Sequence, residues 1–368
     1  MSSLQRVVTA LPTVALVVLA LAACAPEPEP EAQPTQTIAP TPTETIAAPS
    51  APGSRVPMTC EQLFAGVDGF TGGPAVDVAL DSLLLKATVD QAGFEYCTIS
   101  GAIGATPVEI RTVVGVEIDE AVIQRSIEFA EEYGLGTNVG GELSYSECIP
   151  VDTYSYCVTE IFAGGYVLQF STSPDGPVAA DFEQSFRSFA ADLGDRALAW
   201  PAPAPAWAAP EGALTWAHTC ETEVAASDAA IRAAMPFEVM PPTIIGSGDG
   251  FSMFYEAERR QQATSCSWYG SGEQYGSVSV EIAPGAAWIV EQGTPLPGTA
   301  IDYPGALAAS VVDWPSEAEP TQAWLWVAID GSIVVVEVST GGVSFDRQAA
   351  IEASTRVVDA VVAEFGTP

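Results

Sequence analysis

The hydrophobic pattern divides the chain into an apolar start, a polar stretch and two folded regions. The apolar block 7–23 precedes residues 25–57, in which proline recurs without any apolar period. From residue 58 onward, segments with the two-residue period of strands alternate with segments that have the i, i+4, i+7 period of helices. A proline-rich stretch, 200–210, interrupts this pattern once. The pattern therefore predicts two folded domains behind a leader and a tether.

Both regions are predicted to consist of helices packed on antiparallel hairpins. In the first region helices are expected at 59–66, 119–133 and 178–193, with strands at 94–101, 106–117, 140–148, 155–162 and 166–172. In the second region helices are expected at 220–234, near Ala286 and at 346–365, with strands at 262–269, 275–283, 323–329 and 333–340. The strongest hairpin signal is Asp330-Gly331 between the last two strands. This arrangement is α+β, not a doubly wound sheet.

An internal repeat relates the two regions. Each opens with a Cys-Glu pair at a helix start and closes with a Ser-x-Arg helix. The interval from Cys97 to Arg187 is 90 positions, as is the interval from Cys266 to Arg356. Each strand cysteine is followed by a Val-Glu-Ile segment, 108–110 and 280–282. We interpret the regions as two tandem copies of one antiparallel-sheet domain flanked by helices.

The repeat gives the domain boundaries and predicts how the cysteines pair. The predicted parts are a leader at 1–23, a disordered tether at 24–57, domains at 58–195 and 216–366, and a linker at 196–215. Six of the seven cysteines follow the tether, an even set that indicates three disulfides in an exported protein. The repeat pairs Cys60 with Cys97 and Cys220 with Cys266. Cys148 and Cys157 have no counterpart in the second copy and are expected to pair across a hairpin.

Charge excludes several partners and chemistries. The chain of 368 residues has 12 basic and 47 acidic residues and a formal net charge of −35, which disfavours nucleic acid and other polyanions. Its one histidine, His218, and one lysine, Lys86, leave no material for most catalytic triads, phosphate-binding loops or histidine metal sites. We expect no cofactor and no metal. Acid pairs carry no weight as catalytic candidates when acids are so numerous.

The start of the chain predicts its location. Leu21-Ala22-Ala23-Cys24, at the end of the apolar block, resembles the lipobox of bacterial lipoproteins. The resemblance implies cleavage before Cys24, a diacylglyceryl group on its sulfur, and a protein held outside the membrane by lipid. The alternative is an ordinary secretory signal with an incidental cysteine. The 33-residue tether that follows is long enough to reach roughly 100 Å in extended form, at ~3.1 Å per residue.

A wider resemblance covers both copies. The predicted acylated cysteine, the acidic Thr/Pro tail, the Cys-Glu helix start and the strand Cys266-Ser267-Trp268 resemble exported lipoproteins of actinobacteria. These include disulfide-stapled sensor-type domains with a PsbP-like α+β fold. In the first copy Thr98-Ile99 replaces the Ser-Trp pair. The resemblance implies a location and a fold, and it implies no particular reaction.

Aromatic residues provide the candidate binding site. All eight tryptophans lie at or after position 200, and Trp324 and Trp326 share one face of a predicted strand whose other face is also apolar. Such a strand is either covered twice or meets a ligand or partner. Trp268 and Tyr269, on a second strand, complete the candidate patch. Trp200 and Trp207 in the linker are expected to pack on a domain or to contact an outside partner.

The predicted function is non-catalytic: an extracytoplasmic lipoprotein that binds or senses a small molecule, an envelope component such as a polysaccharide, or a protein partner. One alternative is a structural or assembly lipoprotein that docks through its aromatic residues. A second is a carboxylate-based hydrolase, which needs two acids facing each other across a polar cleft. An apolar cavity favours small-molecule binding, whereas a flat aromatic patch favours assembly.

Overall fold

The computed structural model describes residues 51–76, 83–132, 139–151, 153–176, 178, 180–210, 213–214, 227–235, 237–240, 243–244, 252–271, 276–315, 320–340 and 346–365. All of them lie in one compact unit, Ile46–Pro368. The predicted leader, Cys24 and most of the tether lie outside these ranges, as do Cys220 and His218. Within them, no helix has both the length and the apolar character needed to cross a bilayer.

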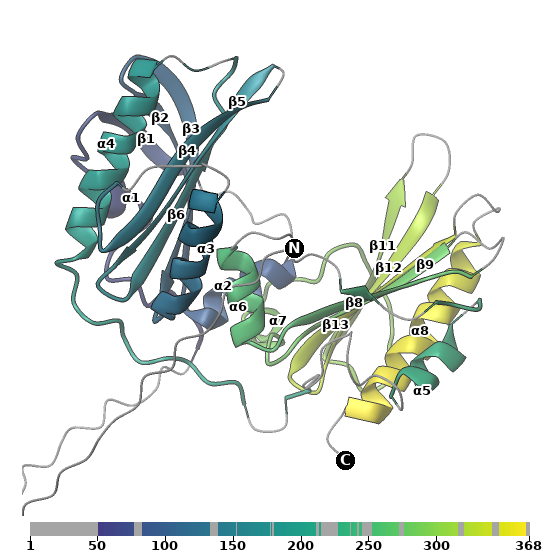
Figure 1. The fold of residues 1–368 in the computed structure, drawn as a ribbon. Coiled ribbons are helices and arrows are strands. Elements are labelled where there is room, and N and C mark those ends of the chain that lie inside the picture. The colour runs from purple at the N-terminus through teal and green to yellow at the C-terminus, as the bar shows by residue number, and fades with distance from the viewer. Residues whose placement is uncertain are drawn as a thin grey trace, which may run out of the picture. The chain divides into compact units, whose positions relative to one another are not determined.

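The first copy is built on an antiparallel six-stranded sheet with the order β1-β2-β3-β6-β5-β4 (Figure 1). Its strands are β1 (Phe70–Val76), β2 (Glu95–Ile103), β3 (Thr106–Val116), β4 (Leu143–Val151), β5 (Tyr154–Ala163) and β6 (Tyr166–Thr172). β2 to β6 confirm the predicted strands. β1 was not predicted from the sequence, because its Gly-Gly-Pro segment is unfavourable in a strand and is tolerated here at the sheet edge.

Four helices belong to the first copy: α1 (Cys60–Phe64), α2 (Leu83–Ala92), α3 (Glu120–Glu132) and α4 (Ala180–Ala197). Thr59 caps α1 in a reciprocal capping box with Gln62, and Asp119 accepts a hydrogen bond from the backbone N–H of Ala121 at the start of α3. α4 covers one face of the sheet with a row of buried phenylalanines (Figure 1). That row is Phe182, Phe186 and Phe189, as the helical period predicts.

The second copy has a seven-stranded antiparallel sheet with the order β10-β11-β12-β13-β9-β8-β7. Its strands are β7 (Thr243–Ile244), β8 (Thr264–Tyr269), β9 (Gly276–Ala283), β10 (Thr299–Ala300), β11 (Ala308–Pro315), β12 (Pro320–Ile329) and β13 (Ser332–Thr340). The predicted hairpin joins β12 to β13. Asp330 and Gly331 both have positive φ there, the conformation that a two-residue type I′ turn requires.

The helices of the second copy are α5 (Ser227–Ala234), α6 (Met253–Arg260), α7 (Trp288–Glu291) and α8 (Arg347–Phe365). α8 covers one face of the sheet, as α4 does in the first copy (Figure 1). α6, which the sequence pattern does not predict, is only eight residues long and too short to establish a helical period. The fold is α+β with two tandem sheet domains.

Sheet order confirms the repeat. Read from β7, the second sheet runs β7-β8-β9-β13-β12-β11, the same path as β1-β2-β3-β6-β5-β4, with β10 added at the edge. Cys97 pairs across the ladder with Thr112, and Cys266 pairs with Val280, so these positions correspond. The two Val-Glu-Ile segments do not correspond: Glu109 pairs with Ser100, four positions from the equivalent of Glu281. That sequence anchor was coincidental.

Two predicted disulfides are present among the described residues. Cys60–Cys97 joins α1 to β2, and Cys148–Cys157 joins β4 to β5. Cys266 is also disulfide-bonded, while its predicted partner Cys220 lies outside the described residues. Disulfides form and persist in oxidising compartments, so the cysteine framework indicates an extracytoplasmic protein.

Each copy contributes one helix to the other. α2 supplies Leu84 and Ala87 to an apolar cluster on the second sheet, and α6 supplies Met253 and Ala257 to the core of the first. The predicted boundary at 196–215 therefore separates the sheets but not all of their covering helices.

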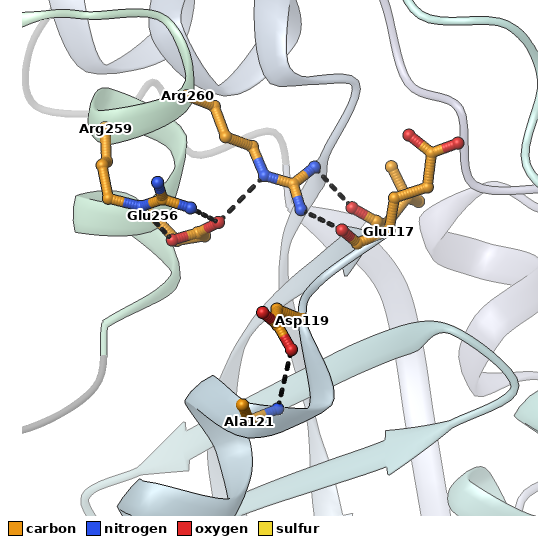
Figure 2. Close-up of polar contacts among 7 residues, drawn as sticks. Glu117, Asp119, Ala121, Glu256, Arg259 and Arg260 are labelled. Carbon is orange, nitrogen blue, oxygen red and sulfur yellow. Dashed lines mark hydrogen bonds and ion pairs between the residues drawn. The ribbon is translucent and has the colours of Figure 1, made fainter.

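The anchors of the exchanged helices are equivalent. Arg260, six residues before Cys266, donates to the carbonyl oxygens of Val116, the last residue of β3, and of Glu117, which follows it (Figure 2). Gln91, six residues before Cys97, donates to the corresponding carbonyl of Pro284 beyond β9 at 3.0 Å. The two helices also contact each other. The repeat is thus a reciprocal assembly of two copies.

The linker packs on the domains. Trp200 lies edge-on against Tyr166 with ring centroids 5.0 Å apart, and the Tyr166 hydroxyl donates to the carbonyl of Pro201. Trp207 packs close to Gly285 in the second copy. A Cβ atom added at Gly285 would lie 3.0 Å from the indole ring of Trp207. Contact with the domains accounts for both linker tryptophans.

Candidate functional site

The candidate site is a cavity of about 760 Å³ on the face of the second sheet opposite α8. Side chains alternate along β12, so Leu325 and Val327 point into the α8 core while Trp324 and Trp326 point to the other side. Both tryptophans line the cavity. The strand with two apolar faces is therefore packed against a helix on one face and borders a cavity on the other.

The cavity wall is largely apolar. Three consecutive leucines of α2, 83–85, form one side, and the indoles of Trp324 and Trp326, which we call the indole pair, form another. Ile282, Val312 and Val335 add branched apolar contacts. Cavities of roughly 300–1,000 Å³ with mostly apolar walls and a few polar groups are typical of small-molecule sites.

Three carboxylates interrupt this apolar wall. Glu258 comes from α6, Glu281 from β9 and Glu337 from β13, and we call them the cavity glutamates. Glu281 pairs with Val335, which lies two positions before Glu337 on β13. Glu281 is therefore the diagonal neighbour of Glu337, with Cα atoms about 7–8 Å apart. Glu337 in turn pairs directly with Trp324 on β12. The register therefore places acids and indoles on one surface.

The two copies carry different side chains on the face that borders the cavity. The strand ladders, aligned on the equivalent Cys97 and Cys266, match residues of the two sheets position by position. Among residues that line the cavity, Ala263 and Ser265 stand where the first copy has Phe94 and Tyr96, whereas Trp324 and Trp326 stand where it has Val158 and Glu160. In the first copy this face is also packed by α6, whose Phe254 contacts Tyr96 with centroids 5.6 Å apart.

Burial raises the pKa of all three cavity glutamates. The pKa of Glu281 is raised from 4.5 to about 7, first by burial and then by the negative charges of Glu258 and Glu337. Burial also raises the pKa of Glu258. Burial raises the pKa of Glu337 as well, while a hydrogen bond from Trp324 lowers it by a smaller amount. The site thus holds three carboxyls that a low-dielectric wall disfavours as anions, and the charges of Glu258 and Glu337 both act on Glu281.

Two further polar features lie at this surface. The indole N–H of Trp326 is buried and has no hydrogen-bond acceptor among the described residues. Lys86 lines the cavity from α2, but its amine is half exposed and pairs with Asp90 at 2.9 Å. The indole N–H is therefore closed off from the cavity, and the cavity's lysine is already engaged.

The structure separates the four aromatic residues predicted from sequence. It brings Trp324 and Trp326 together in the cavity wall. Trp268 is fully buried in the core beneath α8, and Tyr269 is 46 % exposed; neither lines the cavity. The cavity glutamates were missed, although Glu281 and Glu337 each interrupt an apolar strand run, a signal of a functional acid.

Metal chemistry finds no support in the described part of the chain, where no three His, Cys, Asp or Glu side chains are grouped closely enough to hold an ion. His218 and the glycine-rich segment 246–250 lie outside that part.

Comparison with known proteins gives no assignment. No protein-family model and no curated protein sequence matches the chain. Among solved structures, similarity was found to the di-domain ARO/CYC StfQ from the steffimycin biosynthetic pathway, with 10% identity and a TM-score of 0.19, covering 86% of this chain and 96% of that one. MucB in complex with MucA(peri) has 10% identity and a TM-score of 0.16, covering 74% and 96%. Scores this low carry no argument about fold or function.

Proposed function

We propose that the protein is an exported, lipid-anchored binding protein whose second domain holds a small molecule with an apolar body. The observation that carries this proposal is the cavity of about 760 Å³ beside the indole pair. The first copy has the rings of Phe94 and Tyr96 where Ala263 and Ser265 line the cavity, so two copies of one fold differ where a ligand would sit.

Export and anchoring are parts of the same proposal. The disulfides fit an oxidising compartment, and the Leu-Ala-Ala-Cys segment ending at Cys24 fits acylation at that residue. The first peptide of the mature protein is expected to begin at Cys24 and to carry the mass of a diacylglyceryl group. Mass spectrometry of the protein from membranes of its host tests this, and an unmodified Cys24 within a longer peptide would contradict it.

Binding without turnover fits this wall better than hydrolysis does. A glutamate with a pKa near 7 is also what a general acid needs, but a hydrolase of wall polymers needs an open polar cleft. Here the acids share a largely apolar wall with the leucines of α2 and the indole pair. An assembly protein that docks through flat aromatic surfaces has no need of such a chamber.

The test is to fill the cavity with the residue that the first copy uses. Ser265→Tyr introduces the counterpart of Tyr96 into the cavity wall. The mature protein is expected to bind a neutral apolar probe, N-phenyl-1-naphthylamine, with enhanced probe fluorescence, and Ser265→Tyr is expected to reduce the affinity at least tenfold. Tyr269→Ser, which alters an exposed aromatic outside the cavity, is the control and is expected to bind as the parent does.

Equal binding by the parent and Ser265→Tyr, with circular dichroism showing both folded, would contradict the proposed chamber. So would failure of the parent to bind the probe at all.

A further inference from the structure

We propose that the ligand of this cavity is an organic cation, with its apolar body among the leucines and the indole pair and its positive group among the cavity glutamates. This inference rests on the proposed function and specifies the chemical class of the ligand. It is carried by the combination of a cavity, three acids in its wall and two indoles on the same surface.

Charge is the first argument. The titratable groups that face the cavity are Glu258 from α6, Glu281 from β9, Glu337 from β13 and Lys86 from α2. Lys86 is already paired with Asp90, and no basic group contributes to the pKa of Glu281. Buried charges are normally paired, and here three carboxyls share a wall with one engaged amine. A ligand cation supplies the charge that this wall lacks.

Aromatic chemistry is the second argument. Trp324 is the direct cross-strand neighbour of Glu337, and Trp326 is the neighbour of Val335, which pairs with Glu281. Indole faces attract cations within about 6 Å, most strongly where water is excluded. Acids and indoles on one surface are the combination that recognises ammonium groups.

Geometry argues against a bare metal ion. The described residues contain no cluster of three metal-ligating side chains, so the cavity glutamates are too dispersed to coordinate one ion. A cavity of about 760 Å³ with leucines opposite the acids would leave most of its volume empty around an ion. An apolar molecule that carries a charge at one end matches both the dispersed acids and the apolar volume.

The proposal predicts binding that depends on charge and on pH. Because the pKa of Glu281 in the empty site is about 7, the cavity gains negative charge between pH 6 and pH 8. A ligand that binds only the ionised form then gains up to about tenfold in affinity over this range. A quaternary ammonium keeps its charge throughout, so any pH dependence reports the protein.

The experiment compares benzyltrimethylammonium with neopentylbenzene, its neutral carbon isostere, by tryptophan fluorescence titration of the mature protein. At pH 8 the cation is expected to bind at least tenfold more tightly than the isostere. Its affinity is expected to fall toward pH 6, while that of the isostere stays constant. N-phenyl-1-naphthylamine is titrated in parallel to show that the cavity is accessible.

Variants connect this preference to the acids. Glu281→Gln is expected to weaken the cation about tenfold at pH 8, to abolish the pH dependence and to leave the isostere unchanged. Glu337→Gln is expected to weaken the cation in the same direction and serves if the first variant is poorly folded. Glu109→Gln, an exposed glutamate in the other Val-Glu-Ile segment, is the matched control and is expected to change nothing.

Equal affinity for cation and isostere would overturn the proposal and leave the apolar chamber standing. Binding of the naphthylamine but not of the cation would do the same. If none of the three probes binds, the proposed function fails together with this inference.

Discussion

The same face of two equivalent sheets is filled in one copy and hollow in the other. In the first copy Phe94, Tyr96 and Tyr145 fill the face, and α6 from the other copy packs over it. In the second copy Ala263 and Ser265 replace Phe94 and Tyr96, and both line the cavity. Covering helices, sheet order and the positions of the anchors Arg260 and Gln91 correspond in the two copies, so the identity of the side chains on this face is what differs.

The buried acids differ in the same way. In the first copy Glu160 is 1 % exposed and accepts a hydrogen bond of 2.7 Å from Gln169 on the neighbouring strand. In the second copy burial and the charges of Glu258 and Glu337 instead raise the pKa of Glu281 to about 7. One copy satisfies its buried acid internally, which suits a scaffold. The other keeps its acids poorly compensated, which suits a site.

The largest expected effect on stability distinguishes the filled face of the first copy from the hollow face of the second. Phe94→Ala removes a fully buried ring from the first copy and is expected to lower the free energy of unfolding by about 3–5 kcal/mol. The reverse change in the second copy, Ala263→Phe, adds a ring at the cavity wall. It is expected to change the free energy of unfolding by less than about 1 kcal/mol. Urea unfolding measures both. A loss of several kcal/mol in Ala263→Phe would mean that the second face has no usable space.

The next effect concerns charge. Between its ordinary pKa of 4.5 and the folded value of about 7, Glu281 keeps a proton that the unfolded chain releases, so stability falls as pH rises through this range and stays lower above it. Glu281→Gln removes the titration. It is expected to be more stable than the parent at pH 8, on the order of 2–3 kcal/mol, and equal to it at pH 4. Urea unfolding at both pH values checks this, and a pH-independent difference would contradict it.

The smallest effects test the reciprocal anchors. Arg260→Met removes two hydrogen bonds to carbonyls and one to Glu256, and is expected to destabilise the protein by about 1–3 kcal/mol. Gln91→Met removes one hydrogen bond but also a buried carbonyl oxygen without a partner, so its expected loss is below about 1 kcal/mol. Thermal unfolding ranks the two. A larger loss for Gln91→Met than for Arg260→Met would contradict this account of the anchors.

Much of the fold followed from local sequence signals. The capping pair Thr59 and Gln62, the Asp330-Gly331 turn and the phenylalanine row of α4 act within a few residues, so their patterns predict the elements. The elements that the sequence pattern missed are α2, α6, β1, β7, β10 and β11. Several of them depend on partners remote in sequence: β1 pairs with β2, and α2 and α6 each pack on the other copy. Local periodicity cannot reveal such support.

The site was predictable in part for the same reason. Alternation on β12 identified Trp324 and Trp326, but whether their face is core or cavity depends on what packs over it, and α2 comes from the other copy. Trp268 lies two positions after Cys266 on β8, a strand buried on both faces at that point, and sequence could not assign its side. The cavity glutamates come from three separate elements, and only the strand register brings Glu281 near Glu337.

The central claim is that the second copy holds a ligand and the first does not. The most direct measurement is native mass spectrometry of the mature protein and Ser265→Tyr, both purified from an exporting host, before and after denaturation. The account predicts a mass excess on the native parent that disappears on denaturation and is absent from Ser265→Tyr. The same bare mass for both proteins, or the same excess on both, would contradict it.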